Sequence, residues 1–147
     1  MADPTPLTLA DKLEIQELIA RYNWAIDTHD GPGVAATFTQ DGIFDGPGRT
    51  FEGHEALVGF GAGTHLTAES MARGSQHWVT NLVLEGNSEA VTARSMFTRQ
   101  NVDGDRHYTG PIGHYHDELV KVEGRWLFKK RIYRNWPSGN ERTHLHD

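Results

Sequence analysis

Four long segments in the second half of the chain alternate between apolar and polar residues, and this period-two pattern most constrains the fold. The segments are rich in β-branched and aromatic residues, which is typical of half-buried strands. Turn-forming residues separate them, among them Asp103-Gly104-Asp105. The pattern predicts an antiparallel sheet with strands at Ser75–Glu85, Glu89–Gln100, Gly113–Val122 and Arg125–Trp136.

The first half of the chain has a helical period instead. Apolar residues recur every three or four positions from Leu9 to about Thr28, after a capping-box signature at Thr8 and Asp11. Helices before strands indicate an α+β fold, in which a curved, mostly antiparallel sheet wraps around the N-terminal helices as a cone-shaped barrel. Such a cone encloses a pocket at its open end. Shorter elements are predicted as helices at 34–38 and 53–60, a strand at 41–44 and a loop at 61–73.

Length and composition limit the class of protein. The 147 residues suit a single domain, with a core at about 9–136 and loose termini at 1–7 and 137–147. The absence of cysteine excludes disulfides, thiolate metal sites and cysteine nucleophiles. The net charge of −6 argues against a nucleic-acid partner, because phosphate binding needs a basic face. With no apolar run of membrane-spanning length and no signal-peptide pattern, we expect a soluble, cytoplasmic protein without a membrane partner.

The common enzyme motifs are absent or incomplete. The glycines at 59–63 lack the spacing of a dinucleotide-binding loop, and His54-Glu55 has Val58 where a zinc-protease helix would need its second histidine. His114 and His116 share one strand face and could both reach a metal, but the spacing places no third ligand beside them. We therefore predict no metal site.

One carboxylate and one imidazole stand out as a candidate pair. Asp27 closes the apolar stripe of the first helix, near the expected mouth of the pocket. His77 alternates with Val79, Asn81 and Val83 on one face of the first long strand. The alternative is that His77 makes only a local structural hydrogen bond, as most histidines on apolar faces do.

Several motifs, in order and spacing, resemble the SnoaL-like, scytalone-dehydratase-like branch of the nuclear-transport-factor-two superfamily. The resemblance runs from about Leu9 to Trp136. It is carried by the first helix with Tyr22 and Asp27, and by Phe38-Thr-Gln-Asp-Gly, Gly53-His-Glu-Ala-Leu, Gly74-Ser-Gln-His-Trp-Val-Thr-Asn81, Gly113-His-Tyr-His-Asp117 and Gly124-Arg-Trp-Leu-Phe-Lys-Lys-Arg131.

The resemblance implies a cofactor-independent lyase, most plausibly a dehydratase, acting on a cyclic, polyketide- or steroid-like small molecule. His77 would be the general base, Asp27 its orienting carboxylate, and Tyr22 and Arg131 electrostatic helpers. An isomerase or cyclase could use the same proton abstraction. A non-catalytic ligand-binding or assembly module of the same fold is the third alternative.

The roles of the supporting residues have structural alternatives. Tyr22 could be a core aromatic of the helix stripe, and Arg131 could pair with Asp117 or Glu118 on a neighbouring strand. The resemblance also implies a homo-oligomer, a trimer or a dimer. Candidate substrate-binding residues are the polar side chains Asn81 and Tyr115 and the pocket-wall aromatics Phe38, Trp78 and Phe97.

Overall fold

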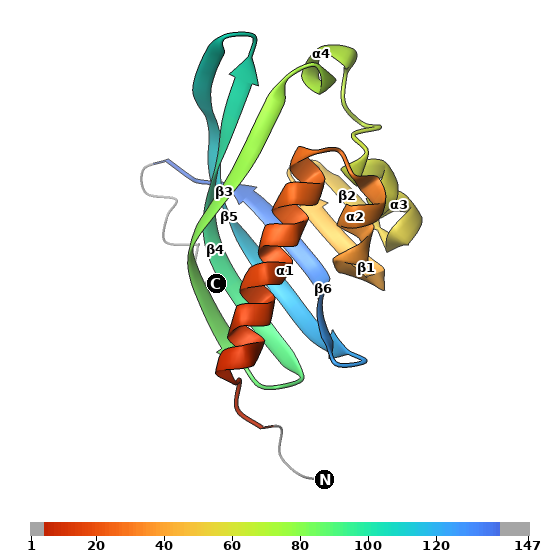
Figure 1. The fold of residues 1–147 in the computed structure, drawn as a ribbon, viewed down its shortest axis with the longest axis vertical. Coiled ribbons are helices and arrows are strands. Elements are labelled where there is room, and N and C mark those ends of the chain that lie inside the picture. The colour runs from red at the N-terminus through yellow and green to blue at the C-terminus, as the bar shows by residue number, and fades with distance from the viewer. Residues whose placement is uncertain (1–4, 139–147) are drawn as a thin grey trace.

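The computed structural model describes residues 5–138. Six strands form one curved, unclosed sheet with a long helix across one face (Figure 1). The mixed α+β fold and the mostly antiparallel sheet predicted from the sequence are confirmed. The elements are α1 (Leu9–Asp27), α2 (Gly31–Ala36), β1 (Phe38–Gly46), β2 (Arg49–Glu52), α3 (Gly53–Gly61), α4 (Ala68–Met71), β3 (Gly74–Gly86), β4 (Ala90–Asp103), β5 (Arg106–Val122) and β6 (Arg125–Asn135).

The strand order across the sheet is β2-β1-β6-β5-β4-β3. All neighbours are antiparallel except β1 and β6, which run parallel with Phe38 opposite Phe128. This pairing extends β1 beyond the predicted 41–44. Strand β2 and the short α4 were not predicted. Helix α2 begins at Gly31, three residues earlier than expected, because the Asp30 side chain accepts a hydrogen bond from the N–H of Gly33.

The N-terminal end of α1 is attached to the sheet through a buried carboxylate. Asp11 and Thr8 form the predicted capping box. Asp11 Oδ1 also accepts hydrogen bonds from Lys121 Nζ at 2.7 Å on β5 and from Trp126 Nε1 at 2.9 Å on β6. These charge-assisted bonds hold the pKa of Asp11 well below its usual value, mainly through Lys121.

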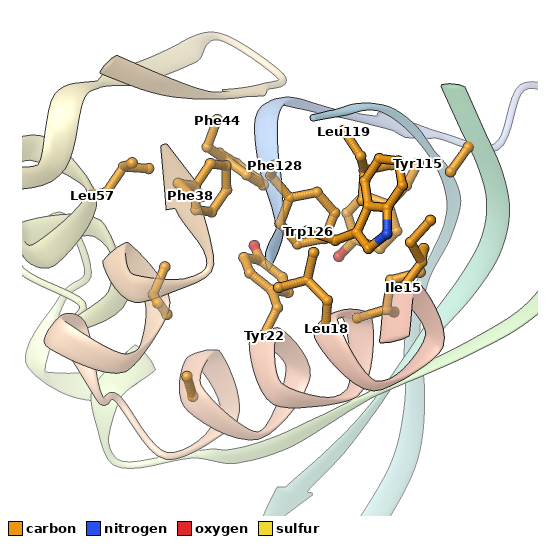
Figure 2. Packing of buried hydrophobic residues seen from close by; sticks show 14 of the residues in the cluster. Ile15, Leu18, Tyr22, Phe38, Phe44, Leu57, Tyr115, Leu119, Trp126 and Phe128 are labelled. Carbon is orange, nitrogen blue, oxygen red and sulfur yellow. The ribbon is translucent and has the colours of Figure 1, made fainter. Parts of the chain in front are cut away.

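The core lies between α1 and the sheet. Figure 2 shows Ile15, Leu18 and Tyr22 of α1 pointing toward Trp126 and Phe128 of β6. Leu9 and Leu13, which belong to the apolar repeat of this helix, are exposed (74% and 57%).

A bulge interrupts β3 and corrects one predicted face. The β3–β4 register shifts between Thr80 and Val83, and Asn81 has a left-handed φ of 55°. The extra residue reverses the alternation, so Leu82 and Leu84 are half-buried and Asn81 is exposed. The inner face of β3 therefore continues from His77 to Leu82, and not to Asn81.

The ends of the chain were predicted to be loose. Residues 1–4 and 139–147 lie outside the described residues. Pro6 forms a bridge with Asn87, and Leu7 packs against the core, so the described part of the N-terminal segment is ordered against the sheet. Within residues 5–138, no helix has both the length and the apolar character that a membrane crossing requires.

Candidate active site

The end of α1 and the start of β3 bring a carboxylate and an imidazole together. Asp27 Oδ1 lies 2.6 Å from His77 Nδ1, and Asp27 Oδ2 accepts a 2.8 Å hydrogen bond from the backbone N–H of His77. The exposed fraction is 13% for the Asp27 side chain and 17% for that of His77. The fold thus pairs, in a partly desolvated setting, two residues that are 50 positions apart in the sequence.

The carboxylate determines which nitrogen of His77 carries the proton. Because an ionised carboxylate only accepts hydrogen bonds, Nδ1 donates, and the neutral ring keeps its lone pair on Nε2. Nε2 has no hydrogen-bond partner among residues 5–138. The ring lies against Phe97, with the two ring centroids 5.8 Å apart. One nitrogen fixed by a carboxylate and the other left free is the arrangement that a general base requires.

His77 lines a cavity of about 340 Å³ between the sheet and the helices. This volume is at the lower end of the range for small-molecule sites. Asp27 is not part of the cavity wall, so its carboxylate lies behind the imidazole. The wall is mainly aromatic, with rings from Tyr22, Phe44, Phe51, Phe60, Phe97, Tyr115 and Tyr133.

A larger groove of about 730 Å³ lies beside α1 and β6. Exposed charged side chains such as Glu14, Glu17 and Arg21 line it, and neither Asp27 nor His77 reaches it. The smaller cavity is therefore the candidate active site, because it surrounds His77 with a mainly aromatic wall. A third groove of about 330 Å³, lined by both Asp27 and His77, is bordered by the exposed Trp24 and Trp78.

Two phenols form part of the cavity wall. Tyr22 and Tyr115 are 1% and 2% exposed, and both line the cavity. Burial raises the pKa of each phenol well above its usual value, so both remain protonated at neutral pH and can donate hydrogen bonds to a ligand.

Arg131 lies behind these phenols and not in the cavity wall. Its guanidinium carbon lies 3.7 Å from the ring centroid of Tyr115 and 4.4 Å from that of Tyr22. Arg131 is fully buried, and its Nε lies 3.6 Å from Asp117 Oδ1 on the neighbouring strand. Arg131 therefore does not line the cavity, and its role as an electrostatic helper stays a prediction. The alternative pairing with Asp117 is what the structure shows, and burial raises the pKa of Asp117 to about 7.

The structure separates the five predicted substrate-binding residues. Phe97 and Tyr115 line the cavity. Asn81 does not, because the bulge turns it to the outer face, where its amide contacts Met96 Sδ. Trp78 is 55% exposed, because its neighbour His77 takes the inner face of the strand. Phe38 is a core residue with 2% of its surface exposed, and its ring packs edge-on against that of Tyr22.

Four nitrogen-bearing side chains of the cavity were missed by the sequence analysis: Arg49, Arg99, His29 and His65. Arg99 could have been found, because it lies two residues after Phe97 and so shares its inner face. The others lie at the ends of helices and strands or in connections between them, where no periodicity indicates a direction. The Arg49 guanidinium donates a hydrogen bond to the backbone oxygen of His65 at 3.2 Å.

The two strand histidines lie away from this cavity. The rings of His114 and His116 are 5.9 Å apart. Among the residues that the structure describes, no three histidine, aspartate or glutamate side chains gather in a way that could hold a metal ion. The second pair, His144 and His146, lies outside the described residues.

Comparisons with known proteins identify relatives over nearly the whole chain. A sequence profile of the SnoaL-like domain matches residues 7–132. No curated protein sequence matches significantly.

Solved structures with the same fold are numerous, and three illustrate their range. A protein of unknown function with a cystatin-like fold from Nostoc punctiforme is 31% identical, with 92% of this chain and 98% of that chain covered and a TM-score of 0.79. A protein from Catenulispora acidiphila in complex with S-DNPA is 29% identical (92% and 98% covered, TM-score 0.77). An NTF2-like protein from Novosphingobium aromaticivorans is 21% identical (93% and 90% covered, TM-score 0.81) and shows the fold alone.

Proposed function

The chain belongs to the SnoaL-like domain family, which includes polyketide cyclases and dehydratases, and from this premise we propose that it is a cofactor-independent lyase of the dehydratase type. The observation that carries the proposal is the Asp27–His77 pair, whose imidazole lines a cavity with a mainly aromatic wall. A purely structural module has no need of a carboxylate fixing a histidine tautomer beside an empty space. The aromatic wall suits a cyclic, polyketide- or steroid-like molecule.

The reaction begins with proton abstraction by His77. Nε2 takes a proton from the carbon next to a substrate carbonyl, and the C–H electron pair moves into an enolate. Asp27, bonded to Nδ1 at 2.6 Å, stabilises the imidazolium that forms. When the enolate collapses, the new C=C bond expels the hydroxyl at the next carbon, and the imidazolium returns its proton so that water leaves. No electron acceptor is required.

The buried phenols act on the oxygen atoms of the substrate. Tyr22 and Tyr115 stay protonated, so each can donate a hydrogen bond to a carbonyl on which negative charge develops. The Arg131 guanidinium stacks on both rings and serves as a positioning residue, because it does not reach the cavity.

An isomerase or a cyclase would share the first step. In an isomerase the enolate is reprotonated at another carbon, and in a cyclase it attacks a second carbonyl. The Asp27–His77 pair supports all three reactions equally, so the assay has to measure proton abstraction separately from the later loss of water.

Turnover of 3-hydroxy-1-tetralone tests the proposal. This bicyclic β-hydroxy ketone loses water to give 1-naphthol, which is fluorescent, and deuterium uptake at C2 of 1-tetralone reports abstraction alone. His77→Gln should lower both rates by roughly 10²–10⁴, the usual contribution of a general base. His107→Gln, on an exposed position of β5, is the matched control. Abstraction without dehydration would favour the isomerase or cyclase, and a His77→Gln rate within a few-fold of wild type would contradict all three.

A further inference from the structure

The charged groups of the candidate cavity are all basic. Two arginines and three histidines line it (Arg49, Arg99, His29, His65 and His77), and no aspartate or glutamate does, in the part of the chain that the structure describes. This distribution contrasts with the chain as a whole, which carries 20 acidic and 14 basic residues. The electrostatic potential inside the cavity is therefore expected to be positive.

His65 reports this excess of positive charge. Burial, and then the charges of Arg49 and His29, hold the pKa of His65 below its usual value. The two arginines differ in their surroundings. Arg49 is exposed at the cavity mouth and already donates to a backbone oxygen, whereas Arg99 is half-buried in the wall.

Arg99 is the basic group nearest to the proposed base along the sheet. It lies on β4 directly opposite His77 of β3 in the strand register, and both side chains face inward. Its Nε is buried and has no hydrogen-bond partner. No ion pair or ring contact involves its guanidinium within residues 5–138. Asp27, whose two oxygens accept from His77, forms no ion pair with Arg99.

Burial of Nε is costly, because it removes water from one donor of this guanidinium without replacing its hydrogen bond. A carboxylate relieves this cost best, since its two oxygens match the planar fork of arginine. A neutral substrate would displace water from Arg99 and offer no compensating charge.

We propose that the molecule bound in this cavity is a cyclic acid whose carboxylate pairs with Arg99 while its ring lies among the aromatic side chains. This inference rests on the proposed function only for the role of His77; the binding step is independent of it. Arg99 lies opposite His77 in the sheet. A ligand whose carboxylate pairs with Arg99 therefore presents the carbons next to that carboxylate to His77. Arg99 thereby becomes the residue that determines substrate class.

A matched pair of ligands tests the proposal on the wild-type protein itself. 2-Naphthoate and 2-naphthamide have the same ring and nearly the same shape, and they differ in charge. Isothermal titration calorimetry at low salt should give a dissociation constant for the amide at least about tenfold larger than for the carboxylate. Equal affinities, or no binding of either compound at millimolar concentration, would overturn the proposal.

Variants then assign the effect to one side chain. Arg99→Gln should bring the ratio of the two dissociation constants close to one while changing the amide affinity little, and Arg99→Lys should restore part of it. Arg125→Gln, on an exposed position of β6, should keep the wild-type ratio. A ratio that survives in a folded Arg99→Gln protein would exclude Arg99 as the binding group.

The binding assay separates this inference from the proposed lyase activity. His77→Gln should keep the preference for the carboxylate, because it does not alter Arg99. If His77→Gln retained turnover while the preference depended on Arg99, the catalytic proposal would fail and the substrate class would stand. If turnover depended on His77 and the preference for the carboxylate were absent, the catalytic proposal would stand and the proposed substrate class would fail.

Discussion

Replacing Asp27 by asparagine tests how the carboxylate controls the base. In the wild-type protein its two oxygens accept from Nδ1 of His77 at 2.6 Å and from the backbone N–H of the same residue at 2.8 Å. An asparagine has one acceptor and one donor group, so it can satisfy only one of these bonds in the same way. When the amide oxygen accepts from the backbone, the amide NH₂ faces Nδ1 and moves the ring proton to Nε2.

The size of the effect can be worked out from these contacts. In the opposite orientation the amide oxygen accepts from Nδ1 and keeps the productive tautomer, but the amide NH₂ then faces the backbone N–H of His77. Two donors meet and the backbone N–H is left unsatisfied, at a cost of about 2 kcal/mol. That cost limits the productive form to about one molecule in thirty. Loss of the negative charge that stabilises the imidazolium costs at least roughly another tenfold. Asp27→Asn should therefore lower turnover of 3-hydroxy-1-tetralone about 300-fold or more.

Nitrogen-15 NMR of the His77 ring gives a second readout that needs no substrate. Long-range proton–nitrogen correlations should show Nδ1 protonated in the wild-type protein and Nε2 protonated in Asp27→Asn. Asp105→Asn, in the exposed β4–β5 turn, controls for a lost surface charge. An unchanged tautomer with turnover within a few-fold of wild type would refute the assigned role of the carboxylate.

Two further predictions concern stability. Asp11→Ala leaves Trp126 Nε1 buried without its acceptor and breaks the capping box, so it should lower the free energy of unfolding by about 2–4 kcal/mol in urea titrations, whereas the exposed Glu14→Ala should change it little. Burial raises the pKa of Asp117 to about 7 in the folded state, so above about pH 4 the folded protein retains a proton that the unfolded chain releases. The resulting contribution to the free energy of unfolding is lost as pH rises from about 4 to about 7. Asp117→Asn should flatten that part of the pH profile even though Arg131 loses a charged partner, and an unchanged slope would show that the group does not titrate there.

The helical and strand segments were predictable because local rules govern them. The capping box at Thr8 and Asp11 marks the observed start of α1, and the turn at Gly104 lies between β4 and β5. Strand β5 nevertheless begins at Arg106, seven residues before the predicted Gly113. The parallel pairing of β1 with β6 was not predictable, because it depends on contacts between Phe38 and Phe128 that lie far apart in the sequence.

The candidate site was predictable only where periodicity or resemblance pointed to it. Alternation placed His77 inward correctly, and the same rule placed Asn81 wrongly once a bulge intervened. Arg131 was inferred from the resemblance alone, and its depth in the core could not be read from the strand pattern. Arg99 was within reach of the alternation rule and was missed because no motif drew attention to it.

Helix α1 is held by a carboxylate at each end, and this has a mechanical consequence. Asp11 joins one end to β5 and β6, Asp27 joins the other to β3, and the two residues lie about 24 Å apart along the helix axis. Because both ends of the helix are attached, it cannot tilt to admit a ligand without breaking the hydrogen bonds of Asp11 or Asp27. The connection at 62–73, which contributes Gly63, His65 and Leu66 to the cavity wall and is mostly exposed, can move without breaking either attachment. His77 thus stays aligned with Asp27 while the connection at 62–73 adapts to the size of the ligand.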